Sequence, residues 1–307
     1  DAWSMDILMN ELLLFYSKGN KPSLRIQYKD YAAWQQSNLN GEGYWLNQFE
    51  GGLPELDLPF AKPRPAVKTY AGETIQKRLP ENVSMALNAL CLETGSTLFM
   101  GLLASMNALL YSYTHQEDII IGTPIAGREH ADLDDQVGLY INTLALRNRF
   151  SGEDSFEDLL SNVKQITLAA YEHQSYPFDE LVQKLNIQRN PGRNALFDVM
   201  VVLQNTAPAT MPATPAGLRI TPLTEVRNPV SALDLTINFI EVGNGIIVNV
   251  EYSTDLFTRL AILRMIDDLQ QLLETVTMDP AIALKQLIPS PKQKLPRKKQ
   301  LIDDLEL

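Results

Sequence analysis

One arginine, Arg128, stands out as a side chain that needs a charged partner. It lies in a polar loop between two apolar runs, residues 119–121 and 137–146, and the turn residues Gly122 and Pro124 open that loop. Apolar runs of this length between turn residues are typical of buried strands. Because an unpaired buried cation is costly to desolvate, a carboxylate is expected beside Arg128. A solvated arginine paired with Glu129 or Asp132 is the simpler alternative.

Hydrophobic periodicity places this loop within an alternation of helices and strands. An amphipathic helix at the start, ended by Gly19, is followed by two short helices after Tyr28. Later helices are predicted at residues 80–93, 97–113, 156–171, 178–185 and 256–276, and strands at 73–79, 119–121, 137–146, 197–204, 233–242 and 245–252. Gly243-Asn244-Gly245 predicts a hairpin turn between the last two strands. Helices interleaved with strands indicate a layered α/β sheet.

Composition restricts the function classes. The chain has 307 residues, 45% hydrophobic content and a formal charge of -11. This charge argues against a nucleic-acid binder, which needs a basic face. The single cysteine, Cys91, fits a reducing compartment, and no apolar run reaches the roughly 20 residues of a membrane span. We therefore expect a cytoplasmic protein with no nucleic-acid or membrane partner.

Four sequence motifs then point to a family. Residues 28–34, YKDYAAW, match YxD(F/Y)AxW in full, and residues 137–147, VGLYINTLALR, match (I/V)GxFVNTxxxR with mild replacements. Residues 173–179, HQSYPFD, resemble HQDxPFE, and residues 189–196, RNPGRNAL, resemble RDxSRNPL with departures. In this order they resemble the later two-thirds of a condensation domain from a nonribosomal peptide synthetase. The resemblance implies an α/β fold like that of chloramphenicol acetyltransferase, a two-layer sandwich of mixed β-sheet and helices.

The resemblance also gives Arg128 a partner. The chain opens with Asp1-Ala2-Trp3-Ser4, which resembles the end of the family motif HHxxxDG followed by (W/V)S. Both motif histidines would then precede residue 1, so the chain is expected to be an internal piece of a longer protein, inactive alone. The family's motif aspartate is described as structural. We therefore predict a buried, bidentate Asp1–Arg128 pair that pins one lobe onto the other.

The implied chemistry is aminolysis of a thioester, in which an acceptor amine attacks a donor acyl thioester. Phosphopantetheine arms of two peptidyl carrier proteins would deliver both substrates, so no cofactor or metal is expected to bind this chain directly. Such a reaction needs an oriented amine and a managed proton. His115, His130 and His173 all suit structural or solvated positions better than this role. No cysteine or serine elbow offers a substitute nucleophile.

By resemblance, several residues are candidates to line the substrate tunnel. They are Trp3, Ser4, Gly138, Asn142, Arg193 and Asn194. Five of them have a plainer alternative: helix capping for Trp3 and Ser4, backbone hydrogen bonding for Asn142, and stabilisation of a strand entry for Arg193 and Asn194. The loop at residues 205–216 is a further candidate, as a bridge between lobes.

The predicted organisation has three parts. Residues 1–60 would complete an N-terminal lobe and end in a proline-rich linker, residues 61–288 would form the C-terminal lobe, and residues 289–307 would be a linker or docking tail. Expected partners are the missing N-terminal lobe, donor and acceptor carrier domains and an adenylation domain. Two alternatives remain open: a non-catalytic relative that recruits carrier or tailoring proteins, and an epimerization domain, which the pattern at residues 137–147 disfavours.

Overall fold

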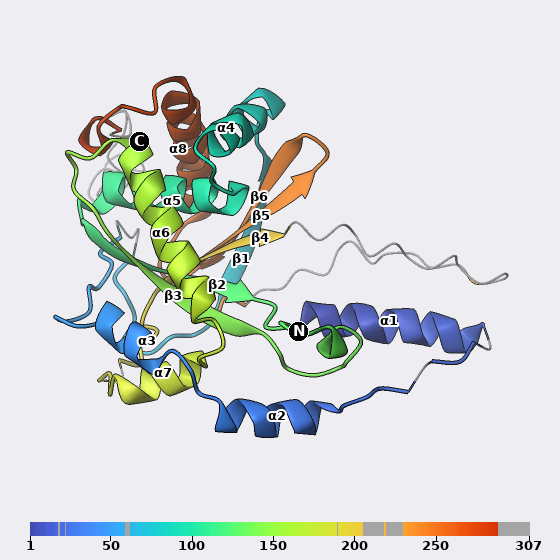
Figure 1. Cartoon of the computed structure of the whole chain (residues 1–307). Helices are drawn as coiled ribbons and strands as arrows, with labels where there is room; N and C mark the ends of the chain where they lie inside the picture. Colours follow the sequence, from blue (N-terminus) through green and yellow to red (C-terminus); the bar gives the residue numbers. More distant parts are fainter. Residues whose placement is uncertain are drawn as a thin grey trace, which may run out of the picture.

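A six-stranded mixed sheet forms the centre of the molecule in the computed structural model (Figure 1), which describes residues 1–17, 19–21, 23–58, 62–188, 190–204, 218 and 230–287. The strands are β1 (Gly72–Arg78), β2 (Asp118–Ile125), β3 (Asn142–Arg149), β4 (Val199–Gln204), β5 (Leu235–Val242) and β6 (Gly245–Ser253). Their order is β1-β6-β5-β4-β2-β3. β4 runs parallel to both β2 and β5, and the other neighbouring pairs are antiparallel.

Four helices form a second layer against this sheet, as Figure 1 shows. They are α4 (Glu81–Glu93), α5 (Leu98–Thr114), α6 (Phe156–Glu172) and α8 (Arg259–Met278). The short helices α3 (Glu42–Gln48) and α7 (Phe178–Lys184) contact each other, and α7 also contacts β3. α1 (Ala2–Tyr16) and α2 (Tyr28–Ser37) extend to one side of the sheet. Two 3-10 turns, η1 (Ala131–Leu133) and η2 (Leu284–Gln286), complete the described elements.

Local signals explain the central helix and the last hairpin. The Thr97 hydroxyl accepts a hydrogen bond from the backbone N–H of Met100, so Thr97 caps the N-terminus of α5. α5 is apolar on all sides and is buried from Phe99 to Ser112. The predicted hairpin is confirmed: Val242 pairs with Gly245, and Gly243 adopts a φ of 62°, which glycine reaches without a steric penalty.

The predicted strand at residues 137–146 is wrong over its first half. β3 begins only at Asn142, and the five residues before it form part of the loop between β2 and β3. The backbone groups of this loop bond to side chains instead of a neighbouring strand: the N–H of Gly138 donates to Ser4 Oγ and that of Tyr140 to Asp1 Oδ2. An apolar run alone cannot distinguish these partners from a strand.

The proline-rich segment packs on the domain as well as connecting its parts. Leu56 and Leu58 are buried in the core, and Arg64 reaches a buried carboxylate. Among the described residues, no single helix is long and apolar enough to cross a membrane. α4 and α5 reach that length and hydropathy only together, and the pair is bent by 108°. The predicted bridge at residues 205–216 and the tail at residues 289–307 lie outside the described residues.

Candidate functional site

Arg128 lies at the centre of the polar contacts that fix the loop between β2 and β3. Its side chain is 1% exposed, and its Nη2 atom lies 3.6 Å from Oδ1 of Asp1, whose side chain is also buried. The guanidinium donates to Ser4 Oγ at 3.0 Å, to the carbonyl of Gln136 at 2.8 Å and to the carbonyl of Leu133. The structure therefore brings together the predicted acid and arginine.

The pairing differs from the predicted bidentate form. Both Asp1 carboxylate oxygens accept from backbone N–H groups, Oδ1 from Ser4 at 2.7 Å and Oδ2 from Tyr140 at 3.2 Å. No hydrogen bond joins Asp1 to Arg128 directly, so the two groups form an ion pair whose donors and acceptors are mostly satisfied by the backbone. Asp1 is also the N-cap of α1, where a carboxylate is favoured by the helix dipole.

Aromatic rings enclose the guanidinium. Its carbon atom lies 4.2 Å from the centroid of the Tyr140 ring and 5.5 Å from that of Trp3. Burial lowers the pKa of Arg128, while the Tyr140 and Asp134 side chains act in the opposite direction. Arginine nevertheless stays charged in proteins. Arg128 forms no ion pair with Glu129 or Asp132 in the described part of the chain; Asp132 faces Arg25 instead, at 3.3 Å.

Three of the predicted tunnel residues gather in this cluster. Ser4 Oγ donates to the carbonyl of Gly138 at 2.8 Å, and Trp3 Nε1 donates to the carbonyl of Asp134 at 2.9 Å. A Cβ atom at Gly138 would overlap the ring of Tyr28 and lie 2.9 Å from Tyr140 Cε2, so only glycine fits between the two rings. These contacts fix the start of α1 against the loop, and any contact with substrate stays a prediction.

Asn142 joins β3 to the turn before α7. Its Nδ2 donates to the carbonyls of Gln174 at 2.9 Å and Tyr176 at 2.8 Å, and its Oδ1 accepts from the N–H of Phe178 at 3.0 Å. This is the backbone-bonding alternative that the sequence left open. Asn142 also lines a cavity of about 420 Å³ between α2 and the loop.

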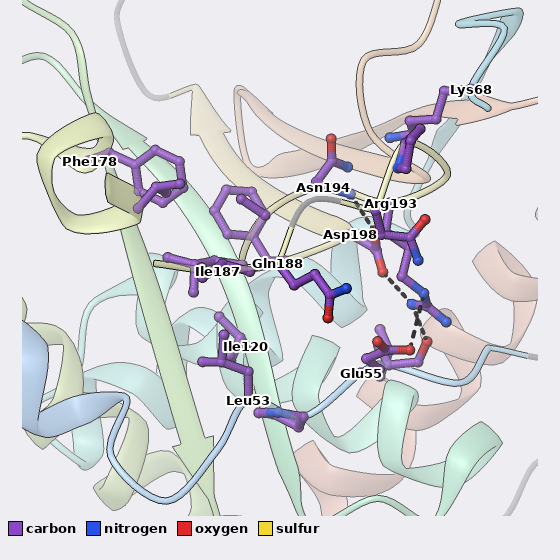
Figure 2. Close-up of a pocket in the computed structure, with 18 of the residues that line it drawn as sticks. Leu53, Glu55, Lys68, Ile120, Phe178, Ile187, Gln188, Arg193, Asn194 and Asp198 are labelled. Carbon is purple, nitrogen blue, oxygen red and sulfur yellow. Dashed lines mark hydrogen bonds and ion pairs between the residues drawn. The ribbon is translucent and has the colours of Figure 1, made fainter. Parts of the chain in front are cut away.

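Arg193 and Asn194 lie elsewhere, on a larger cavity of about 1080 Å³ (Figure 2). Arg193 Nη1 donates to Asp198 Oδ2 at 2.7 Å, and its Nε lies 3.4 Å from Glu55 Oε2. The backbone N–H of Asn194 donates to Asp198 Oδ1 at 3.3 Å. Because Asp198 directly precedes β4, these contacts match the predicted alternative of a stabilised strand entry, and the structure does not bring the two residues to the Arg128 cluster.

A buried charge cluster beside this cavity escaped the sequence reasoning. Arg64 donates to both carboxylate oxygens of Asp234, which is fully buried, and Lys68 donates to the carbonyl of Ala232 at 3.0 Å. Burial raises the pKa of Asp234 and lowers that of Lys68. The sequence signal for this cluster was the pair of cations Arg64 and Lys68, in and just after the proline-rich segment. We interpreted that segment only as a linker.

The three histidines occupy structural or solvated positions. His115 is the left-handed C-cap of α5, and His130 is exposed and accepts from the N–H of Asp132. His173 stacks on Tyr44 with ring centroids 4.2 Å apart. Over the described residues, no group of three or more acids, histidines and cysteines could hold a metal ion.

Comparisons with known proteins find similarity to segments of much longer synthetases. A family profile described as "Condensation domain" matches residues 1–295. Bacitracin synthase 1 of Bacillus licheniformis is 42% identical over 293 residues, which cover 94% of this chain and 6% of that protein. Gramicidin S synthase 2 of Brevibacillus brevis is 41% identical over 293 residues, again 94% of this chain and 6% of that protein. The chain therefore spans a small fraction of the length of these relatives.

Solved structures share the fold. The X-domain from teicoplanin biosynthesis superposes with a TM-score of 0.83 at 24% identity, covering 92% of this chain and 68% of that one. A four-domain nonribosomal peptide synthetase bound to AMP and glycine gives a TM-score of 0.81 at 23% identity, covering 95% of this chain and 24% of that one. At this level of identity the likeness is one of fold.

Proposed function

Because this chain belongs to the condensation-domain family of nonribosomal peptide synthetases, we propose that it is part of an acyltransferase that forms peptide bonds. Its sheet and helix layer confirm the predicted chloramphenicol-acetyltransferase-like α/β class. In the proposed reaction, the amine of an acceptor aminoacyl thioester attacks the carbonyl carbon of a donor acyl thioester. A C–N bond forms, the C–S bond breaks, and the amine proton leaves as the thiol is released.

The observation that carries this proposal is the Asp1–Arg128 ion pair. Its two members are separated by more than a hundred residues in sequence, yet both are buried in contact with the same serine and the same loop. We infer that the pair holds the start of α1 in register with the loop. An imidazole supplied by chain preceding Asp1 would then be positioned over the thioester, since aminolysis depends on alignment of the amine.

Partners follow from the same proposal. Donor and acceptor peptidyl carrier proteins would deliver the substrates on phosphopantetheine arms, next to an adenylation domain in the cytoplasm. α1 exposes Leu8, Leu12 and Phe15, a face that suits cover by the rest of an N-terminal lobe. In this proposal residues 1–60 belong to that lobe, residues 61–288 form the C-terminal lobe and residues 289–307 lead to the next domain.

The test is a complete condensation domain assayed with two loaded carrier proteins. Arg128→Ala should lower the rate of peptide formation by tenfold or more, because misplacement by about 1 Å costs up to roughly 10²-fold. The loss should fall on kcat, with KM for both carriers unchanged and partial rescue by Arg128→Lys. Arg25→Ala is the matched control, since this side chain is 81% exposed and pairs only at the surface.

Wild-type kcat for Arg128→Ala would overturn the positioning role. If that variant fails to fold, Ser4→Ala removes one acceptor of the same guanidinium and takes its place. The recruiting alternative is decided separately by the residues that precede Asp1 in the natural protein: paired histidines support the enzyme and their replacement supports a recruiter. An epimerization domain would instead invert a carrier-bound amino acid without forming a peptide.

A further inference from the structure

The cavity between α2 and the loop that carries Arg128 has an unusual lining. Its volume is about 420 Å³, enough for a small organic molecule. Its walls come from α2 on one side and from the loop, the start of β3 and the turn near residue 174 on the other. The lining includes three aromatic rings and three carboxylates, and no lysine or arginine contributes to it.

Three aromatic rings lie together in the lining, two from α2 and one from the loop. The centroid of the Tyr31 ring lies 4.7 Å from that of Tyr140 and 6.0 Å from that of Trp34. Trp34 is 52% exposed, so much of its surface is available to a ligand. The guanidinium of Arg128 lies 4.2 Å from the centroid of the Tyr140 ring, so one ring of this cluster already contacts a cation.

Three carboxylates, those of Asp30, Glu129 and Asp132, also line the cavity, and only Asp132 pairs with a cation in the described chain. Asp30 accepts from the backbone N–H of Gln27 at 2.8 Å, and Asp132 faces Arg25. The Glu129 side chain makes no hydrogen bond or ion pair with the rest of the described chain. Burial and the charge of Glu129 both raise the pKa of Tyr31, so this carboxylate acts on one of these rings.

We propose that this cavity binds a small organic ammonium ion. The rings of Tyr31 and Trp34 would receive its ammonium group, and Glu129 would supply the compensating charge. An alkyl chain of a few carbons fills the apolar remainder of the cavity, whereas an inorganic cation would leave it empty. The inference does not depend on the peptide-forming activity, because it concerns binding alone.

The test is a titration of the chain labelled with 5-fluorotryptophan and followed by ¹⁹F NMR. The chain has three tryptophans, Trp3, Trp34 and Trp45, and a Trp34→Phe variant assigns the resonance. Millimolar n-butylammonium should shift the Trp34 resonance saturably and leave the Trp45 resonance in place. n-Butanol and butyrate, which match the chain but lack the positive charge, should cause no saturable shift.

Two matched variants test whether Glu129 supplies the charge that binds the ammonium ion. Glu129→Gln should weaken butylammonium binding by roughly threefold, as expected for a partly exposed ion pair. Glu157→Gln makes the same change in α6, outside the cavity lining, and should leave the titration unchanged. Equal shifts with butanol, or an unchanged titration in Glu129→Gln, would overturn the proposal. Nα-acetyl-lysine methylamide serves as a second probe: similar affinity assigns the cavity to lysine side chains, and weaker binding assigns it to free amines.

Discussion

α5 and α1 have similar lengths and both are rich in apolar residues, yet they are held in opposite ways. α5 is buried continuously from Phe99 to Ser112, whereas α1 buries only Ser4 and Leu13. α5 is stabilised by side-chain packing on all sides. α1 is fixed largely by polar contacts in its first turn, where Asp1, Trp3 and Ser4 bond to the loop. Apolar composition alone therefore does not show how a helix is held.

The largest expected effect comes from truncating an apolar side chain in each helix. Leu103→Ala in α5, at a fully buried position, should lower the free energy of unfolding by about 2–5 kcal/mol, because it removes methyl contacts and leaves a cavity. Leu12→Ala in α1, which is 61% exposed, should change it by less than about 0.5 kcal/mol. Urea denaturation followed by circular dichroism measures both, and equal losses would contradict the contrast.

A second variant removes the charge that the polar contacts of α1 surround. Arg128→Met keeps the length of the side chain but removes the cation, leaving the carbonyl of Gln136 and the Asp1 carboxylate without their charged partner. We expect a loss of about 3 kcal/mol in the free energy of unfolding. Arg25→Met, at an exposed pair, should cost less than about 1 kcal/mol. Similar values for the two variants would show that burial of Arg128 adds nothing.

Substitution of two glycines tests how tightly the loop packs. Gly138→Ala should lower the free energy of unfolding by about 1–3 kcal/mol, because the new methyl group overlaps the Tyr28 ring. Gly43→Ala in α3 meets no atom within 4 Å and should stabilise the protein by up to about 1 kcal/mol through helix propensity. Thermal denaturation of the two variants should therefore shift the midpoint in opposite directions.

The smallest expected effect on the free energy of unfolding at neutral pH comes from ionisation of the Cys91 thiol in α4. Burial raises the pKa of this thiol to about 11, although a hydrogen bond from the Gly101 backbone lowers it. Because the folded pKa lies above the ordinary value, this thiol's contribution is complete below pH 9 and is lost as the pH rises through 11.

Alkylation kinetics check this prediction. At pH 8 the native thiol should react far more slowly than in urea, since the thiolate is the reactive form. Leu103→Ala should accelerate the reaction and Leu12→Ala should not, because only the first loosens the packing around α4 and α5. Rapid alkylation of the native wild-type protein would contradict the assigned burial.

Local signals predicted most elements but not the long-range charges. Thr97 before α5 and the Gly243 turn act within a few residues, so a pattern in the sequence suffices. Arg64 and Asp234 are separated by 170 residues, and nothing near either one shows their pairing. Asp1 and Arg128 could be paired only through the family resemblance, and the hydrogen bonding around them differs from the bidentate form expected.

Asp1 divides its carboxylate between two elements, one oxygen for the N–H of Ser4 in α1 and the other for the N–H of Tyr140 in the loop. From Tyr140 the loop leads within two residues into β3, one of the two edge strands of the sheet. A single side chain therefore links the start of α1 to the loop that enters β3, so a shift of one should move the other through the two backbone N–H groups that Asp1 accepts from. An asparagine at this position would keep the size but offer only one accepting oxygen, and so could engage one element at the expense of the other.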